Sequence, residues 1–214
     1  MNINNEFASA DLTAGQLNAI VKKLGGHEKA LAFLRGEITV AEPVRKWREQ
    51  DGIIYFSVTS NGKTGQDWLD YFTANKIKVS DWARELLLSN DFEKTITNKV
   101  ATEIAVLNGM LWNDNDRTIK NIRAEAKQKG WLAPNAEVAC LIRAMFTDQE
   151  LKDMGFWWII TMHEPIKDSD GDRHLLHANR YDGACLGAGY GEPGDRFNRD
   201  GGFAFAVLQV PLEN

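Results

Sequence analysis

The alternation of apolar and polar positions predicts a helical segment over residues 1–45. Apolar side chains recur at helical spacing from Leu12 to Leu24, and Asp11 or Thr13 would cap this first helix. A second short helix is expected from Glu28 to Leu34. Helices of this length are marginally stable alone, so we expect a helical hairpin that serves as a scaffold or an oligomerisation element.

Residues 46–214 contain several runs that predict β-strands. Ile53–Val58 is rich in β-branched and aromatic residues and is expected to be a central strand, while Phe156–Met162 is expected to be a buried strand. Phe203–Val210 is an apolar, β-prone run near the C-terminus. Ala136–Met145 alternates as a strand would, although its Ala and Glu content also suits a helix; we favour the strand.

Helices are expected between these strands. Thr147 would cap a helix from Asp148 to Met154, and Ser80 would cap another. The spacing of apolar residues and the distribution of charge predict three more, over Gly65–Ala74, Thr102–Leu111 and Arg117–Lys129. Helices before and between a few strands, followed by a long irregular tail and a last strand, indicate an α+β domain.

The composition argues against nucleic-acid and membrane partners. The net charge is −5 with acidic and basic residues interleaved, so no basic patch predicts DNA or RNA binding. The N-terminus lacks the pattern of a secretory signal, and the longest apolar stretch, Phe156–Met162, is too short to cross a bilayer. Two cysteines, Cys140 and Cys185, form no disulfide framework or zinc pattern. We therefore expect a soluble, cytoplasmic protein with reduced thiols.

The densest group of ligand-type side chains comprises His163, Glu164, Asp168 and His174. It supports an alternative function as a metal-dependent enzyme, but the sequence after His163 lacks the second histidine that a zincin helix requires. Asp168–Asp172 has the alternating acids of a calcium loop, with glycine at the fourth position and no glutamate at the twelfth. An exposed acidic turn is the favoured interpretation, and a calcium site is the alternative.

The segment from about residue 174 to residue 200 differs from the rest of the chain. It is rich in Gly, Asp, Asn, Arg and Tyr and lacks aliphatic periodicity, so we expect an irregular surface carried by a scaffold. Tyr181, Tyr190 and Phe197 stand among small and polar residues. This mixture is typical of antibody loops, in which Tyr supplies contact area at low entropic cost. The tail therefore predicts a binding surface.

Three motifs connect the tail with a known family. They are Gly189-Tyr190, Pro193-Gly194-Asp195-Arg196-Phe197-Asn198 and Gly202-Phe203-Ala204-Phe205. The tail resembles the variable proteins of diversity-generating retroelements, which have a C-type lectin fold related to that of formylglycine-generating enzymes. The resemblance implies a C-type lectin-like fold for residues 46–214 with a variable region at about 175–207. It also implies a non-catalytic protein that needs no cofactor or metal and binds a protein or a surface glycan.

The resemblance further implies which side chains form the binding surface. In such proteins the adenines of template asparagine codons are randomised, which excludes Lys, Glu, Gln, Met and Trp, and none of these occurs from His177 to Gly191. The enzyme relatives need reactive cysteines or copper-binding pairs, which Cys140 and Cys185 do not clearly supply, so oxidase activity is not expected. The implied ligand-binding positions are His177, Tyr181, Gly183, Ala184, Cys185, Gly187, Gly189, Tyr190, Gly191, Gly194, Asp195 and Gly201.

Overall fold

The computed structural model describes residues 13–39 and 45–211, which divide into two units, residues 1–45 and 46–214. In the first unit, α1 (Ala14–Lys23) and α2 (His27–Leu34) confirm the two predicted helices. Thr13 caps α1 through a capping box with Gln16. Asp11 and Leu12, also named in that prediction, lie outside the described residues.

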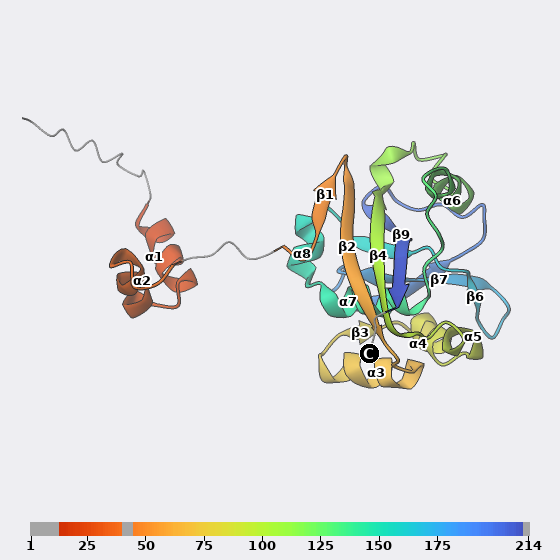
Figure 1. Cartoon of the computed structure of the whole chain (residues 1–214), viewed down its shortest axis with the longest axis horizontal. Helices are drawn as coiled ribbons and strands as arrows, with labels where there is room; N and C mark the ends of the chain where they lie inside the picture. The colour runs from red at the N-terminus through yellow and green to blue at the C-terminus, as the bar shows by residue number, and fades with distance from the viewer. Residues whose placement is uncertain (1–12, 40–44, 212–214) are drawn as a thin grey trace, which may run out of the picture. The chain divides into compact units, whose positions relative to one another are not determined.

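The second unit is built on a mixed sheet with nine strands among the described residues (Figure 1). The strands are β1 (Arg48–Gln50), β2 (Ile53–Asn61), β3 (Lys78–Val79), β4 (Asn98–Asn108), β5 (Trp158–Thr161), β6 (Ile166–Lys167), β7 (Arg173–Asn179), β8 (Cys185–Tyr190) and β9 (Gly201–Pro211). Their order is β1-β2-β4-β9-β5-β7-β8-β3, and β6 pairs with β7. The β5/β9 and β3/β8 pairs are parallel, and the others are antiparallel.

Several helices that connect these strands begin at a polar capping residue. Thr64, Ser80, Thr118 and Thr147 each accept a backbone N–H in the first turn of a helix, which confirms the predicted caps at Ser80 and Thr147. The helices are α3 (Gly65–Ala74), α4 (Asp81–Leu87), α5 (Asn90–Glu93), the 3-10 helix η1 (Gly109–Leu111), α6 (Ile119–Gln128), α7 (Glu137–Met145) and α8 (Asp148–Asp153). Among the helices of the described residues, none is long and apolar enough to cross a membrane.

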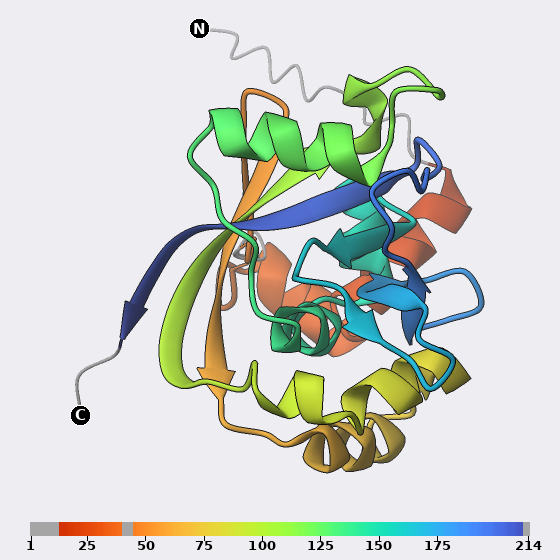
Figure 2. The same cartoon turned by 90° about the vertical axis from the view of Figure 1, so that its right-hand side faces the viewer.

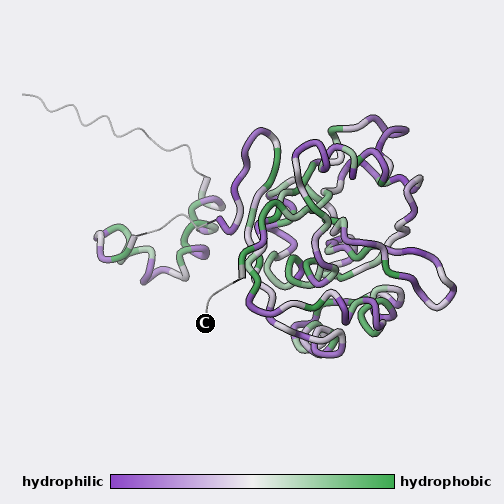
Figure 3. Tube along the Cα trace, turned by 45° about the vertical axis from the view of Figure 1, so that its right-hand side comes forward, coloured by the Kyte–Doolittle hydropathy of each residue, from purple (hydrophilic) through white to green (hydrophobic). Residues whose placement is uncertain are grey.

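Two apolar cores lie on opposite faces of the sheet (Figure 2). The larger core packs α3, α4, α5 and α7 against one face, and the smaller core packs α6 against the other. Strand β9 serves both, because Ala204 belongs to the first core while Phe203 and Phe205 belong to the second. Figure 3 shows hydrophobic positions gathered inside this unit and hydrophilic positions along its outer loops. The structure confirms a mixed α+β domain with the predicted terminal strand.

The predicted helix over Thr102–Leu111 is wrong, because most of this stretch lies in β4. Strand β4 is covered on both faces, and its residues from Ile104 to Leu107 are fully buried. A strand buried on both sides has a continuous apolar run and loses the alternation that identifies strands in sequence. The strand β2, predicted to be central, is second from one edge of the sheet.

The strand favoured for Ala136–Met145 is also wrong, because Glu137–Met145 forms the helix α7. Every residue from Glu137 to Arg143 is buried, so the helix has no exposed face along this stretch. The alternation of apolar residues therefore does not distinguish a strand from a helix here. The Ala, Leu and Met content of this stretch favours a helix intrinsically, and here that propensity prevails.

The tail is more regular than its composition indicates. Strands β7 and β8 form an antiparallel hairpin in which His174 lies opposite Tyr190 and Asn179 lies opposite Cys185. The hairpin buries Leu175, Leu176 and Leu186. Glycine in this segment therefore serves close packing in part, and the irregular backbone is confined to the turn after β7 and the loop before β9.

Candidate binding surface at one end of the sheet

Five strands of the second unit present residues in one row across the same end of the sheet. Lys78 lies beside Cys185, Cys185 opposite Asn179, Asn179 opposite Trp158, and Trp158 beside Gly201. Four segments leave the strands at or beside this row: residues 109–117, 156–157, 180–184 and 195–200. We call the surface that they form the sheet end. It collects parts of the chain that are far apart in sequence.

An exposed aromatic stack occupies the sheet end. The rings of Trp157 and Tyr181 are nearly parallel, with an interplanar angle of 9° and centroids 5.7 Å apart. The guanidinium carbon of Arg180 lies 3.8 Å from the Trp157 ring centroid. Trp157 is 40% exposed and Tyr181 53% exposed, although large aromatic side chains are usually buried. The stack therefore presents two rings and a cation to solvent in a defined geometry.

Backbone hydrogen bonds hold this stack in place. The Trp157 N–H donates to the Asp200 carbonyl at 2.9 Å, and the Arg180 N–H donates to the Trp157 carbonyl at 3.1 Å. The Arg180 Nε donates to the Phe156 carbonyl at 2.8 Å. Partial burial raises the pKa of the Tyr181 phenol, and the nearby Asp200 carboxylate raises this pKa further. The stack is thus preorganised by bonds among the segments that flank β5, β7 and β9.

Two buried arginines fix the loops on either side of the stack. Arg143, 2% exposed, donates to the Asn179 carbonyl at 2.8 Å and to the Asp148 carboxylate at 3.0 Å. Arg117, 3% exposed, donates to the carbonyls of Gly109, Trp112 and Phe197. Because a guanidinium carries five donors in a rigid fork, each arginine ties several carbonyls at once.

A polar hollow adjoins the stack. Two neighbouring cavities, of about 230 and 490 Å³, share Asp114, Arg117 and Arg199 in their walls. The Asp114 carboxylate accepts hydrogen bonds from Arg117 and Arg199, and these bonds lower its pKa. Met110 and Leu111 beside the first cavity are 65% and 58% exposed. The sheet end therefore combines apolar, aromatic and charged groups around a hollow.

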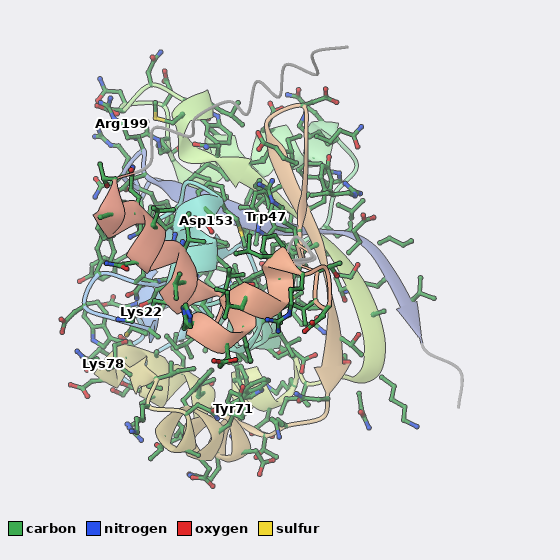
Figure 4. The ribbon with its side chains drawn as sticks, turned by 90° about the vertical axis from the view of Figure 1, so that its left-hand side faces the viewer. Lys22, Trp47, Tyr71, Lys78, Asp153 and Arg199 are labelled. Atoms are coloured by element: carbon green, nitrogen blue, oxygen red, sulfur yellow. The ribbon has the colours of Figure 1, made fainter. Side chains whose placement is uncertain are left out.

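The sheet end extends to the edge strand β3. Lys78 donates to the Asp182 carboxylate at 2.5 Å and to the Asp182 carbonyl at 2.9 Å, so this ion pair ties the β7–β8 turn to β3. Figure 4 shows Lys78 and Arg199 well apart along one side of the domain. The residues of the sheet end therefore extend over the row from β3 to β9.

The positions predicted from the tail do not form one surface. Tyr181, Gly183, Ala184 and Cys185 lie at the sheet end, and burial raises the pKa of the Cys185 thiol. Tyr190 and Gly191 lie at the far end of the hairpin, where the Tyr190 ring packs against Trp82 and His174. Asp195 lies at the border of the sheet end, next to Gly194, in the loop that bonds to the start of α6 through the Ile119 N–H and the Asp195 carbonyl at 3.1 Å.

The remaining predicted positions lie within strands β7, β8 and β9 and are buried or half-buried. Burial lowers the pKa of His177 to about 4. A Cβ atom on Gly187 would lie 2.4 Å from the His177 Cε1 atom, and one on Gly201 would lie 2.1 Å from the Trp158 ring. A Cβ on Gly189 meets its nearest atoms at 4.0 Å, whereas one on Gly191 would lie 3.2 Å from the Arg173 carbonyl. Side-chain variation at Gly187 and Gly201 therefore conflicts with packing.

The residues of the metal-enzyme alternative are only partly brought together. The His163 Nδ1 donates to the Glu164 carbonyl at 2.7 Å, and its Nε2 accepts from the Leu176 N–H at 2.9 Å, so both nitrogens are engaged. The His174 Nε2 lies 2.8 Å from the Asp168 carboxylate, and this contact lowers the pKa of Asp168. Among the described residues, no three His, Cys, Asp or Glu side chains are grouped so as to hold a metal ion.

Sequence reasoning missed much of the sheet end. Trp157 belongs to an apolar run and is expected to be buried, and Met110 and Leu111 fall in a stretch predicted as a helix. Asp114 and Arg199 carry no local signal for a shared site, because their contact joins positions far apart in the chain. The sequence signalled Tyr181 and its neighbours in the β7–β8 turn, together with Asp195, Phe197 and Gly201, by aromatic residues among small polar ones and by the family resemblance.

The fold and the sheet end find no counterpart by comparison. No protein-family model, curated protein or solved structure matches the chain.

Proposed function

We propose that this chain is a non-catalytic ligand-binding protein of C-type lectin-like fold, and that the sheet end is its binding surface. The observation that carries the proposal is the exposed stack of Arg180, Trp157 and Tyr181. Trp, Tyr and Arg dominate the energetic centres of protein interfaces. Because these three side chains are exposed and held in fixed positions, we infer that a partner binds over them.

The chemistry of the sheet end favours a protein ligand, with a surface glycan as the other class. Exposed Met110 and Leu111 extend the apolar contact beyond the stack, which suits a protein surface. Asp114 and Asp182 interrupt the basic residues with negative charge. A nucleic acid would require a more uniformly basic surface.

We also propose that a retroelement diversifies part of this surface. Tyr181, Ala184 and Gly194 are the positions best suited to vary, because their side chains or added Cβ atoms meet solvent or open space. Gly183 meets open space too, but its φ of 82° strains any larger residue. Variation on a supported surface changes contacts without creating cavities in the core.

The binding surface is tested with the purified full chain on arrays of folded proteins and of glycans. Each hit is measured again with Tyr181→Ala, and with Tyr190→Ala as the matched control, since Tyr190 is 52% exposed at the far end of the hairpin. We expect Tyr181→Ala to weaken binding about tenfold or more and Tyr190→Ala to change it less than about twofold. Equal losses in both variants, or no loss in Tyr181→Ala, would contradict the proposal.

The diversification is tested separately at the level of DNA. The flanking DNA is sequenced and searched for an imperfect repeat of the codons for residues 177–207. Mismatches restricted to adenines of the repeat, beside a reverse transcriptase gene, are the expected result. A repeat with mismatches at all four bases, or no repeat, sinks this part of the proposal and leaves the binding surface to be judged by the array experiment.

A further inference from the structure

The strand β2 is covered on its outer edge for only part of its length. β1 pairs with Ile53–Tyr55, whereas β2 continues to Asn61 with β4 on its other side. The turn between β1 and β2 has positive φ at both Asp51 and Gly52, as in a two-residue primed turn, so Gln50 and Ile53 form the closing hydrogen-bonded pair.

In an antiparallel strand the N–H and C=O groups of successive residues point alternately to its two edges. This rule gives the direction of these groups in the part of β2 that β1 does not cover. Since the N–H and C=O of Ile53 point toward β1, those of Ser57 and Thr59 point to the same edge. In the parts of the chain that the structure describes, neither residue has a backbone partner on that side. β2 therefore presents a short row of open donors and acceptors, the template for another strand.

A pocket of about 280 Å³ lies against this open edge. Its wall is apolar and comes from α3 and α7, through Trp68, Tyr71, Leu141, Ala144 and Met145. Figure 4 shows Tyr71 on α3, at the lower side of the domain. This volume is at the lower limit for a small-molecule site and suits one bulky side chain of a peptide.

One polar feature of the pocket defines its ligand further. Lys63 is the charged residue among those lining the pocket, which favours an acidic neighbour in the ligand.

We propose that the open edge of β2 binds an extended segment of a partner protein by strand addition. The partner backbone pairs with Ser57 and Thr59, one large aliphatic or aromatic side chain fills the pocket, and an acidic residue lies near Lys63. The open row of backbone groups favours a peptide over a lipid or a metabolite, because only another strand pairs with both donors and acceptors at strand spacing. This site lies toward the β1 edge of the sheet, away from β8 and β3, and does not depend on the proposed function.

The probe is a phage-displayed library of random linear peptides of about nine residues, panned on the full chain. Enriched peptides are synthesised with a fluorophore, and their affinity is measured by anisotropy. We expect them to share an apolar anchor in an alternating pattern with an acidic residue nearby. Deuterium exchange at the Ser57 and Thr59 amides should slow when the peptide is bound.

Two variants block the site by different means, each with a matched control. Thr59→Pro removes the edge N–H and Thr59→Ala keeps it, while Ala144→Phe fills the pocket and Ala144→Ser does not. We expect the blocking variants to weaken peptide binding about tenfold or more and the controls to stay within about twofold. Tyr181→Ala should bind the peptide as the wild type does, which separates this site from the sheet end.

Specific outcomes would overturn strand addition. One is peptide binding that survives both blocking variants, and another is protection from exchange at the sheet end instead of β2. Self-association in sedimentation that disappears in Thr59→Pro would assign the edge to a second copy of the chain. Ala144→Phe leaves the backbone of β2 unchanged. Peptide binding by this variant therefore tests the proposal even if Thr59→Pro does not fold.

Discussion

Glycines inside strands β8 and β9 and a glycine in the loop between these strands serve opposite purposes. Added Cβ atoms at Gly187 and Gly201 would collide with His177 and Trp158, whereas one at Gly194 meets nothing within 4 Å. Gly187 and Gly201 allow neighbouring side chains to pack against the backbone, whereas Gly194 lies in a loop with no neighbour at this position. The comparison teaches that a glycine-rich segment is not uniformly a variable surface, since identical residues next to different neighbours carry different constraints.

The largest effect is expected at Gly201. Gly201→Ala places a Cβ about 2.1 Å from ring carbons of the buried Trp158, where neither the ring nor the strand has room to move. We expect a loss of about 3 kcal/mol in the free energy of unfolding, as in severe overpacking, and a fall of about 6–12 °C in melting temperature. Thermal unfolding by circular dichroism measures it, with Gly194→Ala as control. A stable Gly201→Ala variant would remove the distinction between the two glycines.

The next effect concerns His177, a half-buried histidine of the hairpin. The pKa of His177 is about 4 in the fold against an ordinary 6.5, so the native state binds fewer protons than the unfolded chain. The stability that neutral His177 contributes to the fold is complete above pH 6.5 and declines as the pH falls toward 4. When the pH falls from 7 to 5, the free energy of unfolding should decrease by about 2 kcal/mol more in the wild type than in His177→Gln.

Urea unfolding of both proteins at the two pH values measures this difference. His163, whose pKa burial also lowers to about 4, remains in both proteins, so its contribution cancels in the comparison. Equal pH dependence in the two proteins would show that His177 is not held neutral by burial.

The smallest effect is expected at Gly187. The atoms that Gly187→Ala would meet are the His177 Cε1 at 2.4 Å and other side-chain atoms, which shift more readily than a backbone. We expect a loss of about 1 kcal/mol, measured by urea unfolding. Gly189→Ala is the matched control, because its Cβ meets its nearest atoms at ordinary contact distance. A larger loss for Gly189→Ala than for Gly187→Ala would reverse the interpretation.

Much of the local structure was predictable from the sequence. The caps at Thr13, Ser80 and Thr147 begin helices as expected, because a side-chain oxygen satisfies a free N–H through contacts within one turn. The apolar run at Phe203–Val210 lies in β9 for the same local reason, its β-prone composition. Polar caps and β-prone composition are therefore visible in the sequence without knowledge of the fold.

Two errors occurred in elements that are buried on all sides and lack the aromatic residues of β5 and β9. β4 and α7 both read as apolar runs, and their identities as strand and helix follow from what covers them. Periodicity records the contrast between a buried face and an exposed one, so it fails when no face is exposed. The aromatic stack of the sheet end was predictable only at Tyr181, since the ring that stacks on it, Trp157, comes from a segment far away in the sequence.

By itself, the sequence determined the mixed α+β character of this protein, the helices that begin at polar caps and the terminal strand. It also indicated an aromatic turn suited to binding. Only the tertiary structure decided which glycines pack and which are open, and that Trp157 and Tyr181 stack on the surface. The physical reason is range: caps and periodicity depend on neighbours within a few residues, whereas exposure and stacking depend on strands brought together across the whole chain.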